Sequence, residues 1–169
     1  MNENIRQQMT AIFEGFRLPR YQEIPDIGLY LEQVVKYLSD HLTPLTGQSV
    51  TGSMISNYVK LRLVSNPVRK QYSREQIAYL MFIAVVKMVL SMEDLKLIIS
   101  IQKATYDTQR AYDYYCSELE NMLEYVFGFK EEPVDVGVDD TDEKLMLRNT
   151  IITVAHKVYL NTLFRLTRG

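Results

Sequence analysis

Residues 73–95 read SREQIAYLMFIAVVKMVLSMEDL, and this stretch decides the fold of the chain. It opens on a capping box, because the Ser73 hydroxyl can accept a backbone N–H one turn on while Gln76 reaches back to the serine. The part that follows is apolar on almost every side up to Leu90, as expected of a helix that neighbouring helices cover. Ser91, followed by acidic residues, predicts the start of another helix. The stretch therefore predicts a buried helix at the centre of a helical protein.

On the N-terminal side, apolar residues at helical spacing predict two amphipathic helices. One covers residues 2–14. The other begins at Pro25, an amino acid suited to an early helical position, and is broken by Pro44 and Gly47. The inward face of this longer helix comprises Ile27, Tyr30, Leu31, Val34, Val35, Leu38 and Leu42.

Residues 51–62 form a third predicted helix, which has two different faces. Its apolar face comprises Met54, Ile55, Tyr58 and Val59. Its polar face comprises Ser53, Ser56, Asn57 and Lys60. Short hydrogen-bonding groups with a lysine differ from an ordinary Glu/Lys surface, so the polar face is a candidate binding surface; a merely solvated face is the alternative.

The segment after this helix is locally basic, although the chain as a whole has a net charge of −2. No acidic residue occurs between positions 60 and 74, whereas the stretch 131–143 holds only acidic charges. The cations of the basic segment are Lys60, Arg62, Arg69, Lys70 and Arg74. A helix that enters the major groove of DNA needs small polar side chains toward the bases and flanking cations toward the phosphates. The order of residues 53–74 meets both needs, and nucleic-acid binding and a solvated basic face remain open alternatives.

The C-terminal half is predicted as a pair of long helices. A helical region runs from Ser91 until Gly128 ends it, the acidic stretch 131–143 forms a loop, and a last helix over 141–167 returns as a helical hairpin. Apolar residues within the first of these helices alternate in steps of three and four over about two heptads, which resembles a coiled-coil seam. The seam consists of Tyr112, Tyr115, Leu119, Met122 and Val126. Since no stretch shows the alternation of a strand, we expect an all-α fold.

Five of the twelve tyrosines fall between positions 106 and 125, and they have two interpretations. They either line a pocket for a flat, apolar effector or belong to the core between the two helices. The residues concerned are Tyr106, Tyr112, Tyr114, Tyr115 and Tyr125.

Composition and motifs argue against several classes of function. The single cysteine, Cys116, and the two histidines, His41 and His156, cannot form a Cys-rich metal site, and they have no clustered partners. The chain contains no phosphate-binding glycine loop and no metalloprotease motif. We therefore expect no catalytic residues, no metal and no cofactor, so that the protein is not an enzyme. With no apolar leader and no stretch long enough to span a membrane, we expect a cytoplasmic protein that does not associate with membranes.

The middle of the chain resembles the DNA-binding domain of MerR-type bacterial transcription regulators over residues 50–99. The resemblance lies in Ile55-Ser56-Asn57-Tyr58, Leu63-Val64, Pro67, Arg69-Lys70, Tyr72-Ser73-Arg74-Glu75-Gln76-Ile77 and Leu90-Ser91-Met92-Glu93-Asp94-Leu95. In addition, Leu18-Pro19-Arg20-Tyr21 and the stretch 24–30 resemble an uncharacterised bacterial family of MerR-like proteins. The MerR resemblance implies a winged helix-turn-helix domain, with double-stranded DNA as the partner.

The resemblance also assigns roles to residues. Ser53, Ser56, Asn57 and Lys60 would lie on the recognition helix, and the basic wing would contact the DNA backbone. The candidate DNA-binding residues are Ser53, Ser56, Asn57, Lys60, Arg62, Arg69, Lys70, Tyr72 and Arg74. The chain departs from the MerR pattern at Ser56, where an arginine is usual, and at Arg62, where a glycine is usual. The segment 67–72 is also too short for the glycine-containing hairpin of that family.

MerR-like regulators dimerise through a long helix, and the Tyr112–Val126 seam occupies the matching position. The resemblance therefore implies a homodimer, with the same seam as a candidate effector pocket for an organic small molecule. We divide the chain into an N-terminal helix (1–20), a MerR-like helix-turn-helix domain (21–100) and a helical hairpin for dimerisation or effector binding (101–169). The main hypothesis is a DNA-binding transcriptional regulator. The alternative is a helical protein-interaction or small-ligand-binding protein that has lost the DNA contacts.

Overall fold

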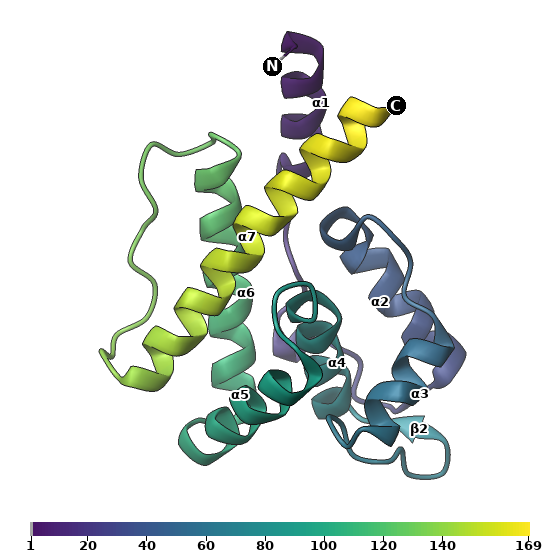
Figure 1. Cartoon of the computed structure of the whole chain (residues 1–169). Helices are drawn as coiled ribbons and strands as arrows, with labels where there is room; N and C mark the ends of the chain where they lie inside the picture. Colours follow the sequence, from purple (N-terminus) through teal and green to yellow (C-terminus); the bar gives the residue numbers. More distant parts are fainter. Residues whose placement is uncertain (1) are drawn as a thin grey trace.

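The computed structural model describes residues 2–169 of the chain. Within this range it contains seven α-helices, one short 3-10 helix and a two-stranded antiparallel sheet (Figure 1). The α-helices are α1 (Glu3–Phe13), α2 (Leu31–Thr46), α3 (Gly52–Lys60), α4 (Arg74–Val86), α5 (Met92–Thr105), α6 (Thr108–Val126) and α7 (Asp142–Arg168). The 3-10 helix is η1 (Tyr21–Glu23), and the strands are β1 (Leu29–Tyr30) and β2 (Gln71–Tyr72). The predicted helical class is confirmed, and the small sheet is an addition to it.

Helix α4 is the central helix that the opening stretch predicts. Ser73 accepts a hydrogen bond from the Gln76 N–H at 3.2 Å, and the Gln76 side chain accepts one from the Ser73 N–H at 2.8 Å, so the capping box is present. Most residues of α4 are buried on every side, as expected of a helix that neighbours surround. The helix ends at Val86, earlier than Leu90, and Ser91 then caps α5 as predicted.

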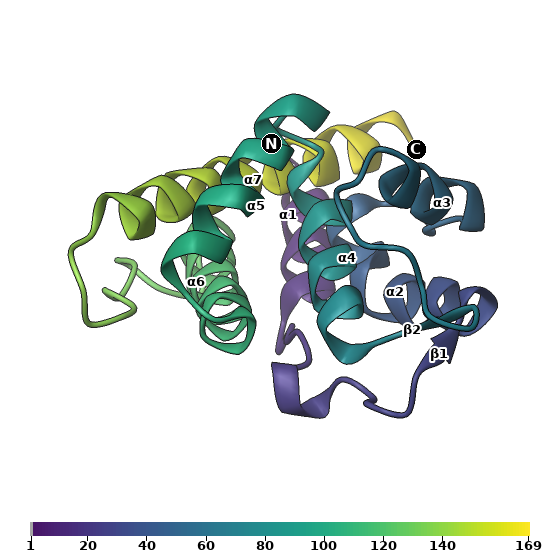
Figure 2. The same cartoon turned by 90° about the horizontal axis from the view of Figure 1, so that it is seen from below.

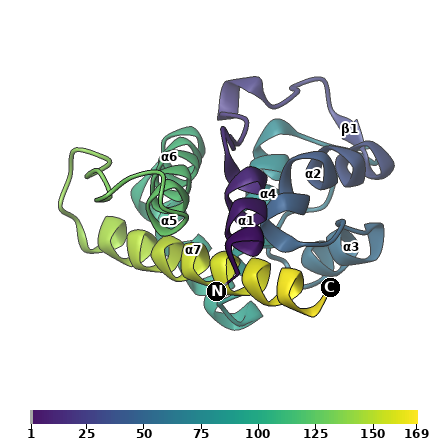
Figure 3. The ribbon, with the colours of Figure 1, turned by 90° about the horizontal axis from the view of Figure 1, so that it is seen from above.

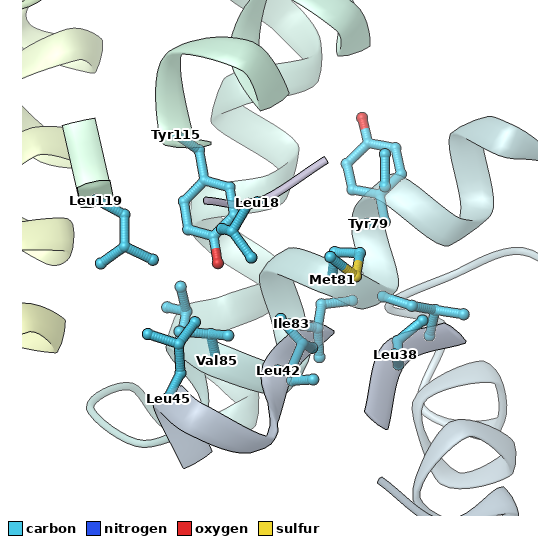
Figure 4. Close-up of a cluster of buried hydrophobic side chains, with 14 of the residues drawn as sticks. Leu18, Leu38, Leu42, Leu45, Tyr79, Met81, Ile83, Val85, Tyr115 and Leu119 are labelled. Carbon is cyan, nitrogen blue, oxygen red and sulfur yellow. The ribbon is translucent and has the colours of Figure 1, made fainter. Parts of the chain in front are cut away.

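A continuous hydrophobic core surrounds α4 and draws on all three predicted segments of the chain. Figure 4 shows its centre, where Leu38, Leu42 and Leu45 of α2 face side chains of α4, and Tyr115 and Leu119 of α6 close the other side. Leu18, in the connector after α1, is also fully buried there. Seen from above, α2 and α3 lie on one side of α1 and α4, while α5 and α6 lie on the other (Figure 3).

The prediction that a helix begins at Pro25 is wrong. Residues 24–28 are not helical, and β1 pairs with β2 so that Leu29 lies opposite Tyr72 and Tyr30 opposite Gln71. Ile27 and Tyr30, assigned to the inward helical face, are 80% and 53% exposed. The apolar residues at helical spacing lie on a helix only from Leu31 onward, where α2 starts.

The prediction that Pro44 breaks this helix is also wrong, because α2 continues to Thr46. A proline removes one backbone donor, and the carbonyl left without it is that of Asp40, an exposed residue that water can reach. Two threonine hydroxyls hydrogen-bond carbonyls of the last turns, from Thr43 to Ser39 and from Thr46 to Leu42. The helix then ends at Gly47, which has a left-handed conformation.

The C-terminal helices differ from the predicted hairpin in two ways. Tyr106 and Asp107 interrupt the long helical region, and the Asp107 side chain caps α6 by accepting from the Arg110 N–H at 2.9 Å. The segment 127–141 then runs back along α6, so α7 crosses α6 in the same general direction (Figure 1). Two contacts confirm this direction. The hydroxyls of Tyr106, just before α6, and Thr141, just before α7, are hydrogen-bonded. The rings of Phe127, just after α6, and Tyr159, in the second half of α7, pack together.

Among residues 2–169, no helix has both the length and the apolar character that crossing a membrane requires.

Candidate nucleic-acid interface

Helix α3 displays the polar face that its sequence predicts. The Thr51 hydroxyl caps the helix by accepting from the Met54 N–H at 3.3 Å, and Ile55 and Tyr58 are buried against the core. Since buried residues at this spacing fix the rotation of the helix, its other side faces solvent. The exposed side chains are Ser53, Ser56, Asn57 and Lys60.

Arg62 occupies an unusual backbone position directly after α3. The Leu63 N–H donates to the Tyr58 carbonyl at 3.0 Å and the Arg62 N–H donates to the Val59 carbonyl at 2.9 Å. This pair of hydrogen bonds is a Schellman motif, which places a left-handed residue after the helix and usually employs glycine there. Arg62 has φ of 59°. The motif therefore holds a cation at the end of the candidate recognition helix.

A tight two-residue hairpin presents two further cations. Val68 and Gln71 exchange backbone hydrogen bonds of 3.1 and 2.9 Å, and between them Arg69 and Lys70 have φ of 51° and 63°. Two-residue hairpins of type I′ need positive φ at both central positions and favour Asn-Gly there. The segment 67–72 thus forms a short hairpin that contains no glycine.

The buried side chain of Gln76 holds the segment that leads into this hairpin. Its amide group donates to the carbonyls of Ser65 and Asn66 at 2.9 and 3.1 Å, while its oxygen completes the α4 capping box. Gln76 therefore fixes the loop between α3 and β2 to the central helix. The capping box points to this glutamine in the sequence, but its second contact depends on the tertiary fold.

Four cations of the basic segment have no anionic partner in the part of the chain that the structure describes. They are Lys60, Arg62, Arg69 and Lys70, all exposed. The salt bridges among residues 2–169 all involve other cations. The acidic loop lies on the opposite side of the molecule from α3 and β2 in all three ribbon views (Figures 1–3), so it does not cover these charges.

Two residues of the predicted interface belong instead to the fold. Tyr72 is 5% exposed and packs in the core. The Arg74 guanidinium donates to the Ile24 carbonyl at 2.8 Å and to the Gln22 side chain at 3.1 Å, and it lies 3.6 Å from a carboxylate oxygen of Asp26. Arg74 thus fastens the extended segment before β1, and neither residue is free to contact a nucleic acid.

The residues of the predicted dimer seam pack in the core of a single chain. Tyr112, Tyr115, Leu119 and Met122 are buried and Val126 is half-buried. The Tyr112 hydroxyl donates to the Pro19 carbonyl at 2.9 Å, because the connector after α1 runs along this face of α6. Helix α7 packs on α6 as well, so these apolar side chains have their partners within the chain. An amphipathic helix does not reveal whether its partner is a second copy or another part of itself.

Side chains that could ligate a metal ion do not cluster in the described residues. No cluster of three or more His, Cys, Asp or Glu side chains within residues 2–169 is arranged to hold a metal ion. Cys116 is buried as expected, and burial raises the pKa of its thiol to about 12, which disfavours the reactive thiolate. Partial burial lowers the pKa of His41, which packs against the ring of Tyr37.

Together these features define a helical protein with an exposed basic surface formed by α3, the end of α3 and the 68–71 hairpin. The chain belongs to the family described as Domain of unknown function (DUF1836), whose model matches residues 19–115, more than half of the 169 residues. The matched range contains the whole basic surface and ends within α6. No curated protein and no solved structure matches the chain.

Proposed function

We propose that this protein binds double-stranded DNA and regulates transcription, as a helix-turn-helix protein of the MerR-like type. The observation that carries the proposal is the shared state of Arg62, Arg69 and Lys70. All three are exposed, and all three occupy backbone positions that glycine would adopt at lower cost. Strained positions collect at functional sites, and cations beside a polar helix face suit the phosphates that flank a DNA groove.

In this proposal α2 and α3 form the helix-turn-helix, and α3 is the recognition helix. The major groove is about 12 Å wide and admits an α-helix, whose outward side chains then meet base edges. Ser56 and Asn57 point outward from α3, and asparagine can pair with adenine through two hydrogen bonds. Arg62 at the end of α3 and Arg69-Lys70 at the hairpin tip contact phosphates, which fixes the register of the helix.

The first test measures affinity for duplex DNA fragments across a range of salt concentrations. Each phosphate contact contributes a slope of about 0.9 to the fall of log affinity with log salt. Replacing both hairpin cations, as Arg69→Ala/Lys70→Ala, should weaken binding strongly and reduce this slope by about two. Alanine keeps a β-carbon at the left-handed positions, so the variant changes charge and leaves the backbone strain in place.

A charge-matched control is Arg6→Ala/Lys103→Ala, since these exposed cations lie on α1 and α5, away from the basic surface. The control should retain affinity and slope within error. Negligible affinity of the wild-type protein at low salt, or an equal loss in both double variants, would contradict DNA binding. Asn57→Ala provides a third arm, which should relax sequence preference while leaving the salt slope unchanged.

We further propose that two copies bind one DNA site, because a single small module buries only about 600–1,000 Å² on DNA. The contact must lie outside the buried Tyr112–Val126 face. Leu160 and Phe164, which are 44% and 48% exposed at successive turns of α7, are the apolar pair to which we assign it. Sedimentation velocity with and without DNA measures the stoichiometry, and Phe164→Ser should lower the dimer fraction.

The second candidate function is that of a small-ligand-binding protein that lacks DNA contacts. A cavity between α6, α7 and the acidic loop favours it, and its chemistry is described below. The two functions are compatible, because the cavity and the basic surface lie at opposite sides of the molecule.

A further inference from the structure

A cavity of about 280 Å³ lies between α6, the segment 136–139 and the first turns of α7. Its volume is close to the lower end of the roughly 300–1,000 Å³ of small-molecule sites. Helix α6 contributes Tyr114, the junction between α5 and α6 contributes Tyr106, and α7 contributes Lys144 and Leu147. The arrangement follows from the parallel packing of α6 and α7, because the returning segment 127–141 covers the groove between them.

Two hydrogen-bond donors of the lining are unused within the described residues. The Tyr114 hydroxyl is buried and has no hydrogen-bond partner. The side chain of Lys144 is only 11% exposed, and the carboxylate oxygen that pairs with its ammonium, on Asp135, is 4.0 Å away, beyond hydrogen-bond distance. A buried donor without a partner costs free energy, so a ligand that supplies an acceptor to both groups gains affinity.

Two carboxylates of the lining accept hydrogen bonds from elsewhere in the chain. Asp139 accepts hydrogen bonds from Tyr106, Thr141 and Arg110, and Asp113 accepts one from the Tyr21 N–H at 2.8 Å. The Tyr114 hydroxyl and the Lys144 ammonium are the donors that an acceptor on a ligand would satisfy. Burial raises the pKa of the nearby Glu118 carboxyl, and an oxygen of this carboxyl lies 3.4 Å from Arg148 Nε.

Apolar groups line the rest of the cavity. Val136 and Leu147 contribute to its wall, and Val138 at its rim is 97% exposed, so an apolar ligand would cover a valine that the protein leaves in water. The backbone of Gly137 lies directly against the two unused donors. A β-carbon there would lie 3.0 Å from Lys144 Cε and 3.3 Å from a ring carbon of Tyr114.

We propose that this cavity binds a small organic carboxylate, with its carboxylate group at Lys144 and Tyr114 and an apolar or aromatic body against Val136, Val138 and Leu147. The proposal does not depend on DNA binding, because the site shares no residue with the basic surface. None of the residues of the predicted seam, Tyr112, Tyr115, Leu119, Met122 and Val126, lines this cavity.

Benzoate is a suitable probe, and benzamide is its uncharged counterpart of nearly the same shape. Titrations of the isotope-labelled full-length protein, followed by NMR, should show benzoate binding in the millimolar range or tighter, with shifts at residues 136–138 and Lys144. Benzamide should bind at least about tenfold more weakly, because it lacks the charge that the ammonium recognises.

The variants Lys144→Met and Tyr114→Phe separate the two donors. Lys144→Met should weaken benzoate binding about tenfold or more, and Tyr114→Phe by a smaller factor. The matched control is Lys157→Met, an exposed lysine on the same helix outside the cavity.

Three results would overturn the proposal: no benzoate binding up to about 10 mM, equal binding of benzoate and benzamide, or shifts that map elsewhere on the protein. Should Lys144→Met fail to fold, Tyr114→Phe and the shift map still decide. Since the titrations contain no DNA, they succeed or fail independently of the proposed regulatory function.

Discussion

At the scale of single residues, Arg62, Arg69 and Lys70 share an energetically costly left-handed conformation. This conformation costs about 1–2 kcal/mol for a residue with a β-carbon, and glycine avoids most of it. The free energy of unfolding of a typical protein is only about 5–15 kcal/mol, so the cost of three such positions is a substantial fraction of it. Function explains their retention if the cations are needed where the backbone places them.

Arg62→Gly tests this exchange between stability and function. Glycine relieves the left-handed strain of the Schellman motif but removes one cation, so the free energy of unfolding should rise by about 0.5–1 kcal/mol while DNA affinity falls. Urea denaturation measures the first effect and the salt dependence of binding measures the second, with the slope falling by about one. An unchanged slope would mean that Arg62 does not contact phosphate.

The polar face of α3 follows from the sequence, because two buried apolar positions fix which side of a short helix is exposed. The roles of Tyr72 and Arg74 do not. A basic residue looks the same in sequence whether it meets solvent or a carbonyl fifty positions away, as Arg74 meets Ile24. The left-handed positions were equally hidden, since neither arginine nor lysine signals positive φ.

At the scale of elements, capping residues correctly predicted where two helices start, whereas prolines predicted helix boundaries incorrectly. Ser73 and Ser91 cap α4 and α5 as predicted, because the serine oxygen bonds an N–H within the same turn. Pro25 instead precedes a strand, and Pro44 lies in the last turn of α2, where one missing donor costs little. Strand β1 is two residues long, which is too short for any alternation to show.

The β1–β2 pair positions the basic hairpin. Gly28 lies directly before β1 and packs closely against Gln71 of β2. Gly28 has φ of 78°, and a β-carbon there would lie 3.2 Å from Gln71. We predict that Gly28→Ala lowers the free energy of unfolding by about 1–3 kcal/mol and weakens DNA binding through the displaced hairpin.

Gly15→Ala is the matched control for this prediction. Gly15 also has positive φ, of 68°, but an added β-carbon would meet nothing within 4 Å. The Gly15→Ala variant should lose only about 1 kcal/mol of unfolding free energy, from the backbone strain, and should keep its DNA affinity. Thermal unfolding and DNA binding of both variants decide the matter, and equal loss of DNA affinity in the two would contradict the positioning role of the strands.

At the scale of the whole molecule, the predicted segments are not independent units. The connector after α1 binds α6 through Arg20, which forms a salt bridge of 2.6 Å with Glu120, and through the Leu18 N–H, which donates to the same carboxylate at 2.8 Å. The family match likewise ends at residue 115, inside α6, although the core continues into α7. Sequence periodicity detected the long helices but could not show that they fold back onto the N-terminal half.

We therefore predict that residues 21–100 alone do not fold. Cutting the chain there exposes the face of α4 that packs on α6 and α7, and the fragment loses much of the apolar burial that stabilises it. Circular dichroism should show a broad, non-cooperative thermal transition, whereas the full chain unfolds cooperatively. A sharp transition of the fragment would show that the helix-turn-helix region is autonomous.

The two ends of α7 touch different parts of the protein. Near its start, Lys144 and Leu147 form part of the cavity wall, and near its end the guanidinium of Arg165 lies against Gly47 in the turn between α2 and α3. A 27-residue helix is a stiff rod about 40 Å long, so a small tilt at one end becomes a larger displacement at the other. A displacement of the first turns of α7 would therefore be carried along the helix to its contact with the turn between α2 and α3.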